Sequence, residues 1–505
     1  MRVLRDLVPL LLLASWPFVA FLAANKAQIF RLEDVLVPWG AYVVALTAGA
    51  LLAARWIRGL SLVRVAIVVG ALSATFFGFG SLGHLLGLAG IELGTVWLLV
   101  WLVAFAAVGG LCWVFSRRPA AWLVTTVVAA AFLVWPSLDL ASAWFTGGSR
   151  QAGEDKVATT QPGTGKMPNV YWFLLDGYVR DDSLRRYFAH DNGPFVQFLS
   201  ERGFQIGWAS HSNYDNTTFS LASTMGMDYV YLPGEPRPPS RAYTRTLAGF
   251  NPVVRKFLAT GYRYIHAPYA GSAKTQCGGL EHRCIRARPS GRIPLNEVQV
   301  NLLRLTPLFR VIRRLMPGAF RYDHIFIADV MAAMRDGEAA PFFLFAHILS
   351  PHAPPRFTPE CRRLDDVAAS LDVGEGFYDP VQFRTDVRCT NRSLERAVRE
   401  IVERDSSDPI IILQGDHGFK FRLPGESEGA LEAAADGVLA ARRLAILNAI
   451  RLPTACRDRF YETISPVNTF RLVFACIEGR QPEFVADRHF LRPRGSEGGL
   501  KEVHP

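Results

Sequence analysis

The feature that most constrains this chain is a series of five apolar runs within its first 150 residues. A helix needs roughly 20 residues to cross a hydrocarbon layer of about 30 Å, and each run is long enough. Arg2 and Arg5 precede the first run as they would in a secretory leader, but cleavage there would leave four further runs in the membrane. The sequence therefore predicts a membrane domain of about five helices over residues 1–145. The runs lie near Leu7–Ala24, Val35–Ala54, Val65–Leu88, Leu93–Phe115 and Ala120–Leu138.

Cationic residues indicate how these helices are oriented, because cytoplasmic loops of membrane proteins are enriched in Lys and Arg. With a cytoplasmic N-terminus, seven arginines fall on the cytoplasmic side, whereas only Lys26 and Arg31 fall in the opposite loops. An odd number of spans then places the chain beyond residue 145 outside the cytoplasm. We therefore expect a multi-pass protein of a bacterial-type inner membrane with a periplasmic globular domain. The seven arginines are Arg2, Arg5, Arg55, Arg58, Arg64, Arg117 and Arg118.

The rest of the chain has the composition of a globular protein. We expect a linker over residues 146–168, a globular domain over 169–480 and a C-terminal tail over 481–505. Lys and Arg number 55 against 45 Asp and Glu, yet no block of Lys and Arg resembles a nucleic-acid-binding arm. The sequence thus argues against nucleic acid as a partner and leaves an anionic membrane surface or an anionic substrate open.

The cysteines agree with a compartment outside the cytoplasm. Cys112 lies in an apolar run, and the other six form sequence-local pairs. An even number of cysteines in an oxidising compartment indicates disulfides, although six cysteines allow 15 pairings in principle. A zinc cluster is the alternative, but no C-x-x-C pair is present. We expect the nearest-neighbour bridges Cys277–Cys284, Cys361–Cys389 and Cys456–Cys476.

Three short apolar runs have the length and β-branched or aromatic content of buried parallel strands. They are Val170–Leu175, Phe342–Ala346 and Ile410–Leu413. Helix signals lie between them, such as Asn251-Pro252 before an apolar pattern that closes at Gly261, and a similar pattern after Asn192. Alternation of strands and helices predicts an α/β domain with a mostly parallel central sheet.

Polar residues follow each of these strands. The first ends in Asp176-Gly177, the second in a segment with His347 and His352, and the third in Asp416-His417-Gly418. Ligands of open α/β sheets bind beyond the carboxyl ends of the strands, so these side chains should meet at one edge. Carboxylates suit hard cations and imidazoles suit zinc or manganese. Singly, each residue fits a turn or a core histidine; their recurrence at three strand ends favours a metal site.

A reactive group is offered by the Ser- and Thr-rich segment around Thr217. Asn216 fits the N-cap of a helix that begins at Thr217, and a helix start favours a bound anion. A nearby cation would lower the pKa of a hydroxyl there. An ordinary Ser/Thr-rich helix start is the alternative interpretation.

Together these motifs resemble the membrane-bound branch of the alkaline phosphatase/sulfatase superfamily, which includes lipoteichoic acid synthases and lipid A phosphoethanolamine transferases. The resemblance covers residues 169–476 and the five-span anchor. It implies a sulfatase-like fold in which Asp176 is the first acidic metal ligand and Thr217 the metal-bound nucleophile. It also implies that Asp416 and His417 complete the ligand set. His347 and His352 match histidines that contact substrate in the phosphoethanolamine transferases.

Two departures narrow what the resemblance implies. Thr217 cannot be converted to the formylglycine of sulfatases, and the Pro and Arg of the sulfatase motif are missing from Thr217-Thr218-Phe219-Ser220-Leu221. Relatives with a second metal usually carry another histidine soon after Asp-His-Gly, and residues 419–441 contain none. We therefore expect one divalent ion (manganese, zinc or magnesium) and no sulfatase aldehyde.

The resemblance implies transfer of a phosphoglycerol or phosphoethanolamine headgroup from a membrane phospholipid to an envelope glycan or lipid. Thr217 would form a phosphothreonine intermediate, and His352 or His347 would protonate the leaving group. The alternatives are a membrane-tethered phosphodiesterase, phosphatase or sulfatase-like hydrolase, and a non-catalytic binding module with the same fold. The sequence leaves the donor, the acceptor and the oligomeric state open.

Overall fold

The computed structural model divides into two compact units, which are described separately. One unit comprises Met1–Asp155 and Gly291–Phe320, and the other Lys156–Ser290 and Arg321–Pro505. The predicted linker over residues 146–168 lies mostly outside the described residues. The structure describes residues 2–26, 32–57, 59–88, 96–148, 167–235, 240–269, 277–287, 293, 295–316, 319, 324–353, 355–364, 379–426, 434–492 and 499–505.

The first unit, here the membrane unit, contains the predicted apolar helices. Five helices of the described chain are long and apolar enough to cross a membrane, which confirms the predicted number. The helices are α1 (Arg2–Asn25), α2 (Glu33–Trp56), α3 (Leu62–Leu88), α4 (Val96–Phe115) and α5 (Ala121–Gly148). α1, α2 and α3 begin before their predicted runs and α5 ends after its run, since polar residues at a helix end reach the interface while their backbone stays hydrogen-bonded. α4 begins at Val96, inside the predicted run Leu93–Phe115.

Two further helices of the membrane unit come from the middle of the sequence: α11 (Glu297–Arg304) and α12 (Pro307–Leu315). Val298 and Leu302 of α11 are buried against apolar side chains of α1, α2 and α3. The Gly80 amide in α3 donates to the carbonyl of Leu305, 2.9 Å away. A Cβ on Gly80 would lie 2.4 Å from the Arg304 carbonyl oxygen, so this backbone contact requires glycine. The sequence analysis placed the whole segment in the globular domain.

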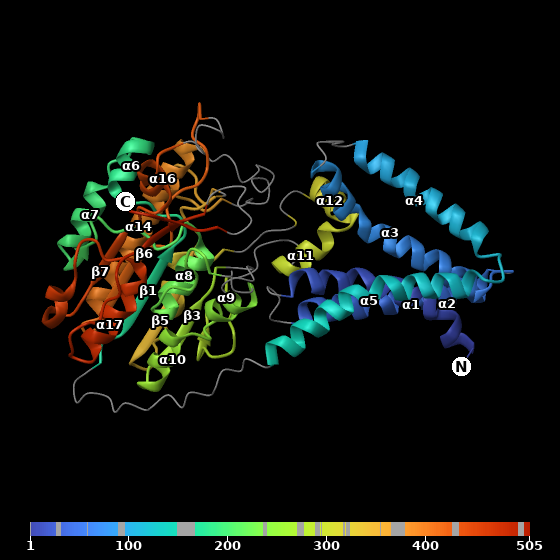
Figure 1. Ribbon diagram of the computed structural model, residues 1–505, viewed down its shortest axis with the longest axis horizontal. Coiled ribbons are helices and arrows are strands. Elements are labelled where there is room, and N and C mark those ends of the chain that lie inside the picture. Colours follow the sequence, from blue (N-terminus) through green and yellow to red (C-terminus); the bar gives the residue numbers. More distant parts are fainter. Residues whose placement is uncertain are drawn as a thin grey trace. The chain divides into compact units, whose positions relative to one another are not determined.

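The second unit, here the globular unit, is built on a mostly parallel sheet, which confirms the predicted fold class (Figure 1). Its described strands have the order β2-β7-β6-β1-β5-β3-β4. β1 is parallel to both β5 and β6, whereas β7 is antiparallel to β6 and to β2. The strands are β1 (Val170–Leu175), β2 (Phe204–Ile206), β3 (Arg263–Ala267), β4 (Arg283–Cys284), β5 (Phe342–Ile348), β6 (Ile410–Gly415) and β7 (Asn448–Arg451).

Helices cover both faces of this sheet, as the two-sided burial of β1 requires (Figure 1). Phe173 and Leu175 pack in a core with α6 (Asp181–Phe188), α7 (Gly193–Ser200), α13 (Ile327–Met334) and α14 (Pro380–Arg404). Val170, Trp172 and Leu174 point to the opposite core, since successive strand residues alternate between faces. That core contains α8 (Thr217–Gly226), α9 (Ser240–Leu247), α10 (Pro252–Ala259) and α17 (Thr469–Ile477).

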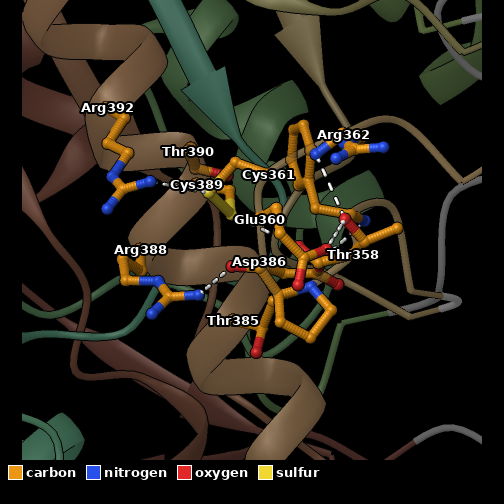
Figure 2. The surroundings of a disulfide bond; sticks show 12 residues. Thr358, Glu360, Cys361, Arg362, Thr385, Asp386, Arg388, Cys389, Thr390 and Arg392 are labelled. Carbon is orange, nitrogen blue, oxygen red and sulfur yellow. Dashed lines mark hydrogen bonds between the residues drawn. A yellow bond between two sulfur atoms is a disulfide. The ribbon is translucent and has the colours of Figure 1, made fainter.

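The three predicted disulfides are all formed: Cys277–Cys284, Cys361–Cys389 and Cys456–Cys476. Figure 2 shows the bridge from Cys361 to Cys389, which fastens a loop to α14. Arg388 reinforces that attachment by donating to the Pro359 carbonyl oxygen. In the same loop the Thr358 hydroxyl donates to Glu360, 2.9 Å away.

Part of the predicted C-terminal tail has regular structure. β8 (His489–Leu491) pairs antiparallel with β9 (Lys501–Val503). Phe490 is fully buried and stacks on Tyr214, which lies three residues before Thr217. The chain end therefore packs behind the loop that precedes α8. The other short elements of the globular unit are α16 (Asp436–Arg443), η2 (Thr454–Arg459) and η3 (Pro466–Asn468).

Candidate active site

The candidate site lies beyond the carboxyl ends of β6, β1 and β5, which are neighbours in the sheet. Leu174 pairs in register with His347 of β5, and Leu175 pairs with Gly415 of β6. Asp176 and Asp416 each directly follow one of these paired positions. Parallel register thus brings together groups that are far apart in the sequence.

The described side chains converge on Nε2 of His417. This nitrogen lies 3.2 Å from Thr217 Oγ1, 3.5 Å from Asp416 Oδ2 and 3.6 Å from Asp176 Oδ1. Asp176, Asp416 and His417 each offer a ligand atom within 4.8 Å of the others, and all three are buried. The four residues named as ligands from the sequence therefore meet at one point.

Hydrogen bonds around the site leave the converging atoms with accepting lone pairs. Asp416 Oδ1 accepts from the amides of Gly177 and His417, both at 2.9 Å, which turns Oδ2 towards the site. Asp176 Oδ1 and Asp416 Oδ2 are buried and accept no hydrogen bond from the described residues. His417 Nδ1 lies 2.6 Å from the Gly418 carbonyl oxygen, so the proton belongs on Nδ1 and the Nε2 lone pair faces the carboxylates.

This donor set fits a cation. Two carboxylate oxygens and an imidazole lone pair repel one another when buried together, and a positive ion removes that repulsion. Burial alone would raise the pKa of the Asp176 carboxyl, but the neighbouring His352 and His347 hold the pKa below its ordinary value. Asp176 is thus an ionised carboxylate at neutral pH, as a metal ligand requires.

Thr217 is held at the amino end of α8. The Asn216 side chain accepts from the Phe219 amide at 3.0 Å and caps the helix, as the sequence predicted. Ser220, one turn along, is buried. The first amides of α8 and the helix dipole favour negative charge next to the Thr217 hydroxyl.

The two predicted substrate histidines occupy different environments. His347 is fully buried inside β5, which extends past the predicted strand end, and its Nε2 lies 3.6 Å from Asp176 Oδ2. His352 is exposed and its backbone amide donates to the Asp176 carbonyl oxygen at 3.0 Å. Its ring lies 6.2 Å from the ring of His417. Only His352 of this pair can meet a substrate that arrives from solvent.

A charged cluster that was not predicted from the sequence surrounds Asp215, in the loop before α8. Asp215 is buried, and its carboxylate lies 3.7 Å from Lys420 Nζ and 3.7 Å from Arg443 Nη1. Lys420 follows His417 by three residues, whereas Arg443 comes from α16. Asp215 could have been suspected from the sequence because it lies two residues before Thr217. Its partners Lys420 and Arg443 could not, because only the tertiary fold brings them close.

Comparison with known proteins finds no matching family description and no matching curated sequence. Similar solved structures are found. The chain resembles the integral membrane lipooligosaccharide phosphoethanolamine transferase A (EptA) of Neisseria meningitidis, with 12% identity and a TM-score of 0.40. That match covers 94% of this chain and 95% of the other.

Two further matches cover the globular part. The periplasmic domain of Escherichia coli EptC matches at 9% identity and a TM-score of 0.42, over 68% of this chain and 94% of that domain. The lipoteichoic acid synthase LtaP of Listeria monocytogenes matches at 12% identity and a TM-score of 0.39, over 68% and 81%. Similarity at this level does not extend to substrate or chemistry.

Proposed function

We propose that this chain is a membrane-anchored, metal-dependent phosphoryl-group transferase. The observation that carries the proposal is the Thr217 hydroxyl at a helix start, 3.2 Å from His417 Nε2 and beside two buried carboxylates. A hydroxyl in that setting is a nucleophile next to a cation site, the arrangement needed for attack on a phosphate ester.

Asp176, Thr217, Asp416 and His417 would hold one divalent ion: manganese, zinc or magnesium. When bound, such an ion lowers the pKa of the hydroxyl and neutralises charge on the phosphoryl oxygens. The buried carboxylate oxygens that accept no described hydrogen bond support this assignment.

The reaction would proceed in two steps: the phosphoryl group moves from the donor to Thr217, and then from Thr217 to an acceptor. In the first, Thr217 Oγ1, whose proton has already passed to solvent, bonds to phosphorus and the bond from phosphorus to the leaving oxygen breaks. His352 protonates that oxygen, since it is the exposed histidine at the rim. In the second, an acceptor hydroxyl gives its proton to His352 and attacks phosphothreonine, which releases Thr217. The amino end of α8 stabilises the phosphoryl oxygens in both steps.

We assign His347 a positioning role. It is buried against Asp176 Oδ2 and cannot reach solvent, so it orients the carboxylate and leaves proton transfer to His352. His347→Gln should then weaken metal affinity about 10- to 100-fold, as loss of a group that orients a ligand does. His352→Gln should instead lower the rate with little change in metal affinity.

The donor would be a phospholipid, because the globular unit is part of a membrane-anchored chain, and the acceptor an envelope glycan or lipid. The deciding experiment incubates the purified full-length chain with phospholipid labelled in its headgroup, a divalent ion and an envelope extract. Label in a new lipid or glycan product supports transfer. Release of free labelled headgroup indicates the hydrolase, and an unchanged donor with every metal tested would contradict both.

A further inference from the structure

The segment with α11 and α12 has an unusual place in the fold. Sequence neighbours on both sides of it belong to the globular unit, yet it joins the membrane unit. It contacts one end of the helix bundle: Phe18 and Phe21 near the end of α1, Val35 at the start of α2, and Gly80 near the end of the third span. These positions share one side of the membrane, opposite the N-terminus. The segment therefore lies at the membrane boundary on that side.

α12 has two chemically opposite faces. Leu308, Val311, Ile312 and Leu315 follow the i, i+3, i+4, i+7 pattern of a single apolar face. Arg310, Arg313 and Arg314 follow the i, i+3, i+4 pattern on the other side, and α12 contains no acidic residue. No side chain of α12 is buried, and Leu308 and Leu315 are 44% and 75% exposed. An exposed apolar face within a membrane unit needs an apolar environment.

Contacts between α12 and the helix bundle indicate the depth at which the arginines of α12 lie in the membrane. The Arg310 guanidinium lies 5.4 Å from the ring of Phe79 in α3. Phe79 packs against Trp97 and Trp101 of α4, so this end of the bundle is rich in indole rings. Tryptophan is enriched at the level of lipid headgroups. The arginines of α12 are thus placed at headgroup level.

We propose that α12 is an interfacial helix that binds anionic phospholipid headgroups through Arg310, Arg313 and Arg314. Its apolar face enters the outer part of the acyl layer. Charge complementarity selects this occupant, because three guanidinium groups with no acidic residue between them favour a negative surface. Bidentate hydrogen bonding of guanidinium to phosphate adds to this preference. The proposal does not depend on catalysis at Thr217.

The first test measures lipid preference. The full-length chain is placed in nanodiscs of equimolar phosphatidylcholine and phosphatidylglycerol, and the lipids retained on the protein are counted by native mass spectrometry. Arg313→Gln/Arg314→Gln should lower retained phosphatidylglycerol relative to phosphatidylcholine by about fivefold or more, since each arginine contributes about that factor near an anionic surface.

The matched control is Arg185→Gln/Arg186→Gln, which removes two adjacent exposed arginines from α6 of the globular unit. It should keep the lipid preference of the parent chain. The proposal is overturned if the α12 variant keeps the parent's preference, or if both pairs lower it equally.

The second test locates the apolar face. A nitrobenzoxadiazole probe is attached to Leu315→Cys in a Cys112→Ser background, and its fluorescence is quenched by lipids with nitroxide-labelled acyl chains. Strong quenching is expected, whereas a probe on Val381→Cys, 57% exposed at the start of α14, should be little affected. A Leu315 probe shielded from both these lipids and aqueous iodide would show that protein covers the face, and would overturn the proposal.

Discussion

At the scale of single residues, the candidate site depends on which hydroxyl faces His417. Thr217 and Thr218 are adjacent at the start of α8, and residues on a helix are rotated by about 100° from one to the next. Only Thr217 has its hydroxyl within 3.2 Å of His417 Nε2. The geometry thus agrees with the residue chosen from the family motif, while its role as nucleophile stays a prediction.

Thr217→Ala should abolish turnover of labelled phospholipid, a loss of at least about three orders of magnitude, as for removal of a covalent nucleophile. Thr218→Ala is the control and should keep substantial activity. Both variants should fold, because the cap from Asn216 to Phe219 remains. Trapping of the phosphorylated peptide maps the modified residue directly, and phosphate on Thr218 would refute the assignment.

Asp416→Asn should lower the amount of divalent ion that copurifies with the chain, since it removes a buried charge that faces His417. Metal analysis after dialysis against limiting zinc or manganese provides the measurement. Asp408→Asn, in an exposed ion pair with Arg451, is the control and should bind metal as the parent chain does. Equal metal content in both variants would contradict the proposed ligand set.

His266 gives a pH prediction with a defined sign. It is fully buried between the rings of Tyr264 and Phe345, and burial, assisted by His347, lowers its pKa from 6.5 to about 3. The unfolded chain therefore binds this proton at a higher pH than the folded chain. The neutral ring's contribution to stability is present above pH 6.5 and is lost progressively as the pH falls towards 3.

His266→Phe should therefore reduce the loss of unfolding free energy between pH 7.5 and pH 5.5 by roughly 1.4 kcal/mol, the value of one pKa unit. Thermal unfolding of the purified chain at the two pH values tests this. His504→Phe, at an exposed position near the chain end, should leave the pH dependence unchanged. An identical slope in parent and His266→Phe would show that this histidine does not titrate on unfolding.

At the scale of elements, two of the disulfides attach loops to the central sheet or to a helix that packs on it: Cys277–Cys284 at β4 and Cys361–Cys389 at α14. Cys361–Cys389 closes 28 residues, whereas Cys277–Cys284 closes seven. A longer closed loop restricts the unfolded chain more, so the two bridges should differ in what they contribute.

Replacing Cys361 and Cys389 by serine should lower the free energy of unfolding by about 3–4 kcal/mol, and replacing Cys277 and Cys284 by about 1 kcal/mol less. Denaturant titration of the two double variants under oxidising conditions gives both values side by side. A larger loss at the shorter loop would show that loop entropy is not the main contribution there.

At the scale of the whole molecule, the topology predicts that residues beyond 145 lie outside the cytoplasm. A phosphatase reporter fused after residue 480 should be active and a fluorescent protein that folds only in the cytosol should be dark. The reverse result would refute the orientation. Fusions after Ile57, between α2 and α3, should give the opposite pattern and serve as the internal control.

Several features can be predicted from the sequence because they arise from local chemistry. Runs of apolar residues predicted the five spans, because a segment that crosses the hydrocarbon layer needs apolar side chains and a helix that satisfies its own backbone hydrogen bonds. Val170–Leu175 was identified with its final ends because all six side chains are buried, as in a central parallel strand. Asn216 was recognised as a cap because only its side chain and the next three residues are involved.

Other features depend on contacts between distant parts of the chain, and only the tertiary structure decides them. The environments of His347 and His352 differ because β5 continues to Ile348. His347 is therefore buried inside the strand, whereas His352 lies beyond its end and is exposed. Asp215 meets Lys420 and Arg443 across more than 200 positions of sequence. The segment with α11 and α12 was assigned to the globular domain because it lies within residues 169–480, whose composition is that of a globular protein; its two helices have an ordinary amphipathic pattern. Such a pattern fixes which face is apolar, but the surface that receives this face is set by packing elsewhere in the chain.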